Sequence, residues 1–137
     1  MRIWYLLKLY LVALVVLLGL DMLWIGVVAK SFYAEQIGFL MAKEPNLMAA
    51  GLFYLLFPIG LLIFVILPAL KEKKLKIYRA AFMGGLFGFF AYAAYDLTNM
   101  ATIAHWPLAM TVVDMIWGAT ISAAVATSSL LVGKRVS

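Results

Sequence analysis

The stretch Tyr92–Gly118, YAAYDLTNMATIAHWPLAMTVVDMIWG, decides how the rest of the sequence is interpreted. It is largely apolar, yet it holds two of the three aspartates of the chain, its only histidine and two of its four tryptophans. The uncharged segment around Pro107 predicts a short turn between two long apolar runs. The stretch therefore predicts the end of one membrane-spanning helix, a turn and the start of the next.

The composition excludes a soluble fold. Of the 137 residues, 67% are hydrophobic and 12% are charged, whereas soluble domains contain about 25% charged residues. A spanning helix needs about 20 apolar residues, so the chain has room for four spans and for no separate soluble domain. We expect an all-α integral membrane four-helix bundle with up-down-up-down topology.

The apolar runs place the spans at about 4–29, 46–70, 78–100 and 108–132, within a single transmembrane domain covering 1–137. The first run could also be a signal peptide, but signal peptides have an apolar core of about 7–15 residues. This run is longer and contains Asp21 and Trp24, which favours a retained helix. The connection 30–45 is too apolar for a solvated loop and predicts a short interfacial helix, or else a kinked extension of the first helix.

The basic residues predict the orientation of the chain. Nine Lys and Arg residues lie in the N-terminal segment, the second connection and the C-terminal tail, and two lie in the first connection. The excess places both termini in the cytoplasm. The net charge of +5 thus reports topology and not nucleic-acid binding. The five basic residues of Lys71–Arg79 could also contact anionic lipid headgroups, although such loops often only set topology.

Small residues predict close packing of the third span. Gly84 and Gly88 form a small-xxx-small pair, which lets two helices approach closely in lipid. The partner could be another helix of the bundle or the same face of a second protomer, so a homodimer is possible from the sequence. The absence of cysteine excludes disulfides and thiolate metal sites.

Three aspartates are expected within the membrane. Asp21, Asp96 and Asp114 fall on three different spans, each roughly 10 Å from the outer end at 1.5 Å per residue. A carboxylate facing lipid is energetically costly, so all three should point inward and approach one another. We expect an outward-facing polar pocket with Trp24, Tyr92 and Trp117 in its wall.

The neighbouring polar and aromatic residues complete the candidate pocket. Its members are Asp21, Trp24, Tyr92, Asp96, Thr98, Asn99, His105, Thr111, Asp114 and Trp117. The aspartates could hold a divalent metal with His105 and Asn99, share a proton, or be satisfied by internal hydrogen bonds. Simpler interpretations also exist: Asp96 as a helix cap, His105 as a loop residue and the tryptophans as interface anchors.

Three functions follow from such a pocket. The first is binding or translocation of a small cation, proton or polar solute, although polar residues do not continue far toward the cytoplasmic side. The second is a membrane enzyme acting on a lipid or lipid-linked substrate. The third is a structural or assembly partner whose acids are purely structural. The sequence contains no known catalytic motif and assigns no cofactor.

Four segments resemble a known family. They are Leu20–Gly26, Phe53–Tyr54, Tyr95–Asn99 and Val113–Gly118, which include the motifs Tyr-Asp-Leu-Thr-Asn and Asp-x-x-Trp-Gly. Together they resemble bacterial predicted membrane proteins with the domain of unknown function 2177. The resemblance implies a multi-pass protein of the bacterial inner membrane. It adds Thr98 and Asn99 to the aspartates and tryptophans as motif residues, and it implies no activity.

Overall fold

The computed structural model describes residues 2–74 and 76–136, and the side chains of residues 2–74 and 76–134. Two parts of the chain that the sequence analysis uses lie outside this description. They are Leu75, within Lys71–Arg79, and the side chain of Arg135, one of the basic residues counted for the orientation. The described chain forms α-helices joined by short turns. They are α1 (Ile3–Leu23), α2 (Lys30–Ile37), α3 (Leu47–Leu61), α4 (Leu67–Leu70), α5 (Ile77–Thr102) and α6 (Leu108–Val136).

Two long helices contain a π-helical turn. In η1 (Trp24–Val28) the turn continues α1, and in η3 (Leu62–Ile66) it joins α3 to α4. The four resulting spans are Ile3–Val28, Leu47–Leu70, Ile77–Thr102 and Leu108–Lys134, with mean hydropathies between 1.2 and 2.6. All exceed the length of about 20 residues that a bilayer requires, so the predicted all-α, four-span architecture is confirmed.

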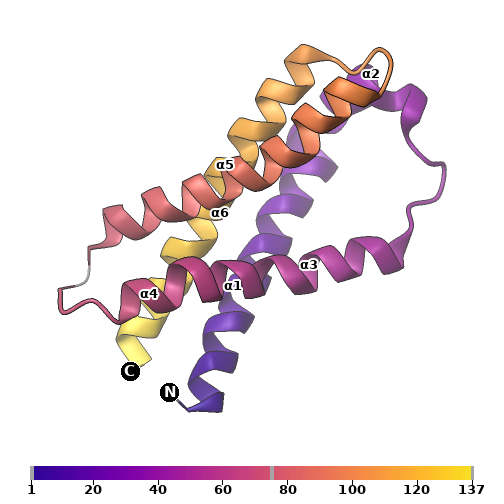
Figure 1. Ribbon diagram of the computed structural model, residues 1–137. Helices are drawn as coiled ribbons and strands as arrows, with labels where there is room; N and C mark the ends of the chain where they lie inside the picture. The colour runs from indigo at the N-terminus through magenta and orange to yellow at the C-terminus, as the bar shows by residue number, and fades with distance from the viewer. Residues whose placement is uncertain (1, 75, 137) are drawn as a thin grey trace.

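The chain enters and leaves the bundle at the same end. The N- and C-termini lie close together, while α2 and the turn between α5 and α6 lie at the opposite end (Figure 1). The predicted short helix of the first connection is present as α2, followed by a 3-10 turn, η2 (Gly38–Leu40). Ala29 separates it from η1 with a non-helical backbone, so α2 is a separate element and not an extension of α1.

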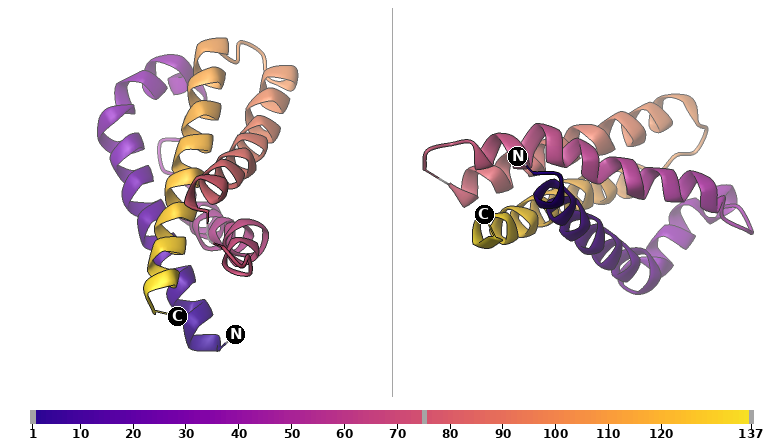
Figure 2. Two further views of the ribbon diagram at one scale, coloured as in Figure 1. Left: turned by 90° about the vertical axis from the view of Figure 1, so that its left-hand side faces the viewer. Right: turned by 90° about the horizontal axis from the view of Figure 1, so that it is seen from below.

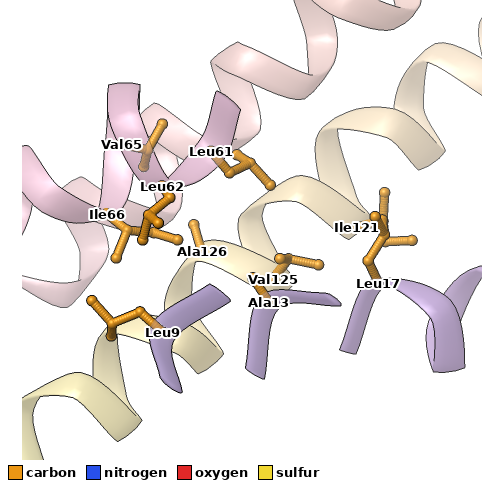
Figure 3. Packing of buried hydrophobic residues seen from close by; sticks show 10 residues of the cluster. All are labelled: Leu9, Ala13, Leu17, Leu61, Leu62, Val65, Ile66, Ile121, Val125 and Ala126. Atoms are coloured by element: carbon orange, nitrogen blue, oxygen red, sulfur yellow. The ribbon is translucent and has the colours of Figure 1, made fainter. Parts of the chain in front are cut away.

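The apolar core lies in the half of the bundle nearer the termini. On α1, Leu9, Ala13 and Leu17 recur every four residues and are fully buried, because this spacing places them on one face of the helix. They pack against η3 and against α6, where Val125 is also fully buried (Figure 3). Asp21 continues the same face one turn further on. The periodicity that builds the core thus carries an aspartate into the bundle.

The glycine pair of α5 packs against α6 of the same chain, and the two helices run side by side in both views of Figure 2. A Cβ added at Gly88 would lie 2.1 Å from the carbonyl oxygen of Gly118, and one at Gly84 would lie 2.9 Å from the Ala126 Cβ. The glycines therefore let the two backbones approach within the bundle. Of the two partners expected from the sequence, the structure shows the one within the bundle: this face packs on α6.

We predict that Gly88→Ala destabilises the protein by about 1–3 kcal/mol, because the new methyl group must push α5 and α6 apart. The measurement is reversible unfolding in mixed detergent micelles. Gly19→Ala is the control, since no atom lies within 4 Å of a Cβ at that position. Equal unfolding free energies for the two variants would contradict the close packing of α5 on α6.

Candidate functional site

The three aspartates lie at the end of the bundle opposite the termini. Asp21 precedes the end of its span by seven residues, Asp96 precedes the end of α5 by six, and Asp114 follows the start of α6 by six. The three are therefore at similar depths. Asp21 and Asp96 are buried and Asp114 is half-buried, so none of these carboxyl groups lies fully exposed on the lipid-facing surface.

Asp21 joins three helices through its carboxylate. The indole Nε1 of Trp117 on α6 donates to its Oδ1 at 3.0 Å, and the hydroxyl of Tyr54 on α3 donates to its Oδ2. Two donors satisfy both oxygens of the ionised form, and hydrogen bonds to a charged group are stronger than neutral ones. Asp21 therefore links α1, α3 and α6 at the level where the apolar core ends.

Asp114 is held by the helix of the first connection. The Tyr33 hydroxyl on α2 donates to Asp114 Oδ1 at 2.7 Å, and the indole Nε1 of Trp24 donates to the same hydroxyl at 3.1 Å. Burial raises the pKa of the Tyr33 phenol, and the Asp114 carboxylate raises it further against the opposing effect of the Trp24 indole. The phenol thus stays protonated and keeps donating to Asp114.

Two segments share the pattern Asp-x-x-Trp, Asp21–Trp24 at the end of α1 and Asp114–Trp117 in α6, and they lie opposite each other. Their indoles, Trp24 and Trp117, stack with ring centroids 4.4 Å apart and an interplanar angle of 8°. Trp117 donates directly to the aspartate of the other segment, whereas Trp24 reaches Asp114 through Tyr33. Because the helices run in opposite directions (Figure 1), the similar segments pair in a crossed arrangement, with one direct link and one link through a phenol.

Asp96 has a different environment. It is fully buried, and neither of its oxygens has a hydrogen-bond donor among the described residues. The polar group facing it is the Asp114 carboxyl. Asp96 is thus a buried carboxyl group whose hydrogen-bonding capacity is unmet by the described residues.

Two cavities open beside this network. The larger has a volume of about 510 Å³ and the smaller of about 220 Å³. Asp21, Ile25, Tyr92 and Asp114 line both. The larger cavity extends toward α3 along aromatic side chains, and the smaller one extends toward α2. No Lys or Arg among the described residues lines either cavity, so the carboxyl groups there have no basic partner.

The larger cavity reaches the lipid-facing surface. Three of its lining side chains, Ile25, Phe53 and Tyr95, are 40–55% exposed. All three lie within the candidate spans, and Phe53 and Tyr95 are six and seven residues from the helix ends that lie opposite the chain termini. The opening is thus about 10 Å inside the ends of the spans.

The other residues of the predicted pocket are distributed differently. Thr98 is exposed and donates to backbone carbonyls of its own helix, while buried Thr111 donates to the carbonyl of Pro107. His105 is exposed in the α5–α6 turn with φ 62°. Neither these three nor Asn99 lines the two cavities. In the described part of the chain, no three acidic or histidine side chains are grouped so that they could hold a metal ion.

The structure also gives the local environments of Asp96, His105 and the two stacked tryptophans. Asp96 lies inside the continuous helix α5, so it is not the cap of a short helix beginning at Leu97. His105, which the sequence predicts as a loop residue, lies in the turn between α5 and α6 and has a left-handed backbone conformation. Trp24 and Trp117 belong to the polar network and not to an interface belt alone.

Sequence reasoning missed several residues of the site. They are Tyr33, Phe53, Tyr54, Phe57 and Tyr95. A signal existed for Tyr54, because it is the one hydroxyl-bearing residue in an otherwise apolar span, and such a group needs a partner in lipid. For Phe53 and Phe57 no signal existed, since phenylalanine is equally common on lipid-facing surfaces. The contact of Tyr33 with Asp114 depends on how α2 folds back over the bundle.

We predict that Tyr54→Phe costs about 1.5–3 kcal/mol of stability, because it removes a donor from a buried carboxylate. The measurement is again reversible unfolding in mixed micelles. Tyr10→Phe is the matched control: it also removes a phenol that joins α1 to α3, but that phenol donates to the Leu55 carbonyl at 2.8 Å. A smaller loss, of about 0.5–1.5 kcal/mol, is expected there. Equal losses would show that Asp21 does not depend on Tyr54.

Comparison with known proteins agrees with this architecture. The model of a family described as a predicted membrane protein, domain of unknown function 2177 (DUF2177), matches residues 6–131. No curated protein and no solved structure matches the chain. The match covers all three aspartates, both stacked tryptophans and Tyr33 and Tyr54. The chain belongs to this family of predicted membrane proteins, whose function is unknown.

Proposed function

We propose that this membrane protein binds a small cationic ligand at the cavities beside Asp21 and Asp114. The observation that carries the proposal is the lack of any basic side chain among the described lining residues, although two carboxyl groups line both cavities. An acidic group within a bilayer is stabilised by hydrogen-bond donors, by a proton or by a cation, and Asp114 accepts from Tyr33 alone. A positively charged ligand in the cavity provides such stabilisation.

Binding is better supported than translocation. A carrier needs a polar path across the membrane, and the half of the bundle nearer the termini is filled by the apolar core (Figure 3). Polar side chains of that half are engaged in packing: Ser129 donates to the Leu9 carbonyl at 2.9 Å, and Ser122 is fully buried against α5. The cavities therefore support a site that fills and empties from one side.

The lateral opening of the larger cavity supports a second candidate function, an enzyme acting on a lipid or lipid-linked substrate. The substrate would enter between α3 and α5, past Phe53 and Tyr95. Asp114 would be the general acid or base, because Asp21 already accepts from two donors. This function additionally needs a reacting group on the substrate that lies beside Asp114.

The ends of the bundle suggest an orientation and a lipid contact. Both termini and the loop that contains Lys71–Lys74 lie at one end (Figure 1), and we place this end in the cytoplasm of a bacterial cell. In this loop Arg79 pairs with Glu72 at 3.3 Å, and Lys73, Lys74 and Lys76 are exposed. These lysines are available to anionic headgroups of the inner leaflet.

The test is native mass spectrometry of the protein purified in mild detergent. We expect a small molecule or ion to remain on the wild-type chain and to be lost from Asp114→Asn. Of the two carboxyl groups that line the cavities, Asp114 accepts one hydrogen bond and Asp21 accepts two. Glu35→Gln is the control, since it removes an exposed acid of α2 outside the cavities. A bare wild-type chain, with no mass change on adding cations, would favour a purely structural network in an assembly partner.

A further inference from the structure

The walls of the larger cavity are aromatic. Five of its nine lining residues carry an aromatic ring. The rings form a continuous surface: Phe53 packs on Phe57 at 5.2 Å between centroids, and Phe57 contacts Tyr92 edge-on at 6.3 Å. The faces of such rings attract cations, most strongly where water is excluded, and aromatic cages of this kind bind quaternary ammonium groups.

The carboxyl groups beside these rings provide one free acceptor. Both oxygens of Asp21 already accept hydrogen bonds, from Tyr54 and Trp117. Asp114 accepts from Tyr33 alone, and it lines the cavity while its other neighbour, Asp96, lies behind it outside the lining. The cavity thus combines one available carboxylate with several aromatic faces, which suits a single monovalent cation of appreciable size.

An inorganic cation suits this cavity poorly. Calcium takes six to eight oxygen ligands and magnesium demands six in an octahedron. In the described chain no three acidic or histidine side chains form such a group, and the volume of about 510 Å³ far exceeds that of an ion. This volume lies within the range of about 300–1,000 Å³ that is typical of sites for organic ligands.

We infer that the larger cavity binds an organic ammonium ion that carries an apolar substituent. This inference rests on the proposed cation-binding function and names its ligand class. The ammonium group lies beside Asp114 against the rings of Tyr92 and Tyr95, and the apolar substituent extends past Phe53 through the lateral opening. The ammonium can belong to a free amphiphilic amine or to the headgroup of a membrane lipid.

The test compares two ligands of the same shape. Benzyltrimethylammonium carries a positive charge, and neopentylbenzene is its uncharged carbon isostere. Each is titrated by calorimetry into the protein in maltoside micelles, with empty micelles as blank. We expect the ammonium ion to bind and the isostere to bind at least about tenfold more weakly, since a buried cation–π contact is worth about 2 kcal/mol and 1.4 kcal/mol is tenfold.

Variants locate the binding. Phe53→Leu removes a rim ring that is 40% exposed. We expect it to weaken binding of benzyltrimethylammonium about two- to tenfold, because it removes the aromatic pair with the benzyl group of the ligand. Its control is Phe90→Leu, since Phe90 is 64% exposed and lies outside this cavity. Asp114→Asn should reduce the preference for the charged ligand, because it removes the carboxylate and leaves the aromatic faces in place. A thermal unfolding scan of each variant shows whether it is folded. If Asp114→Asn does not fold, Phe53→Leu still tests whether the ligand binds in this cavity.

The outcomes separate the two proposals. Equal affinity for both ligands, or binding that Phe53→Leu leaves unchanged, overturns the ammonium inference. If neither ligand binds but native mass spectrometry finds a different ion lost from Asp114→Asn, the inference fails and cation binding stands. Added phosphatidylethanolamine distinguishes the sources: competition with benzyltrimethylammonium assigns the site to a lipid headgroup. No competition, with phosphatidylglycerol as the control lipid, assigns it to a free amine.

Discussion

The crossed pairing of Trp117 with Asp21, and of Trp24 through Tyr33 with Asp114, is the interaction on which the half of the bundle opposite the termini depends. In lipid, apolar surface does not drive helices together, so association requires close packing and polar contacts. The stacked indoles hold α1 against α6, and each indole N–H is directed at an acceptor that cannot face the bilayer. The same contacts fix the positions of the two carboxyl groups that line the cavities.

The two halves of the bundle are therefore stabilised differently. Nearer the termini, glycines allow α5 to pack closely on α6, and buried aliphatic side chains fill the space between α1, η3 and α6. Toward the other end, large aromatic rings and carboxyl groups replace the aliphatic ones. The two cavities lie among these rings and carboxyl groups.

Much of the architecture and part of the site could be predicted from the sequence. The lengths of the apolar runs indicate four spans, and counting residues from the helix ends places Asp21, Asp96 and Asp114 at one depth. The cost of a carboxylate in lipid directs all three inward. The same reasoning did not place Thr98 on the exposed face of α5, nor His105 outside the cavities, because motif membership says nothing about the direction of a side chain.

The sequence by itself determined that the chain lies in lipid, how many spans it has and how far along each span the aspartates lie. Hydropathy and residue spacing are properties of each helix alone, so they need no knowledge of the packing. Tertiary structure decided which donor binds which carboxylate. Tyr54 donates to Asp21, and Tyr33 donates to Asp114 because α2 folds back over the bundle. It also decided that Gly84 and Gly88 face α6 of the same chain. These contacts depend on how each helix is rotated and packed against its neighbours, which is fixed only when the helices assemble.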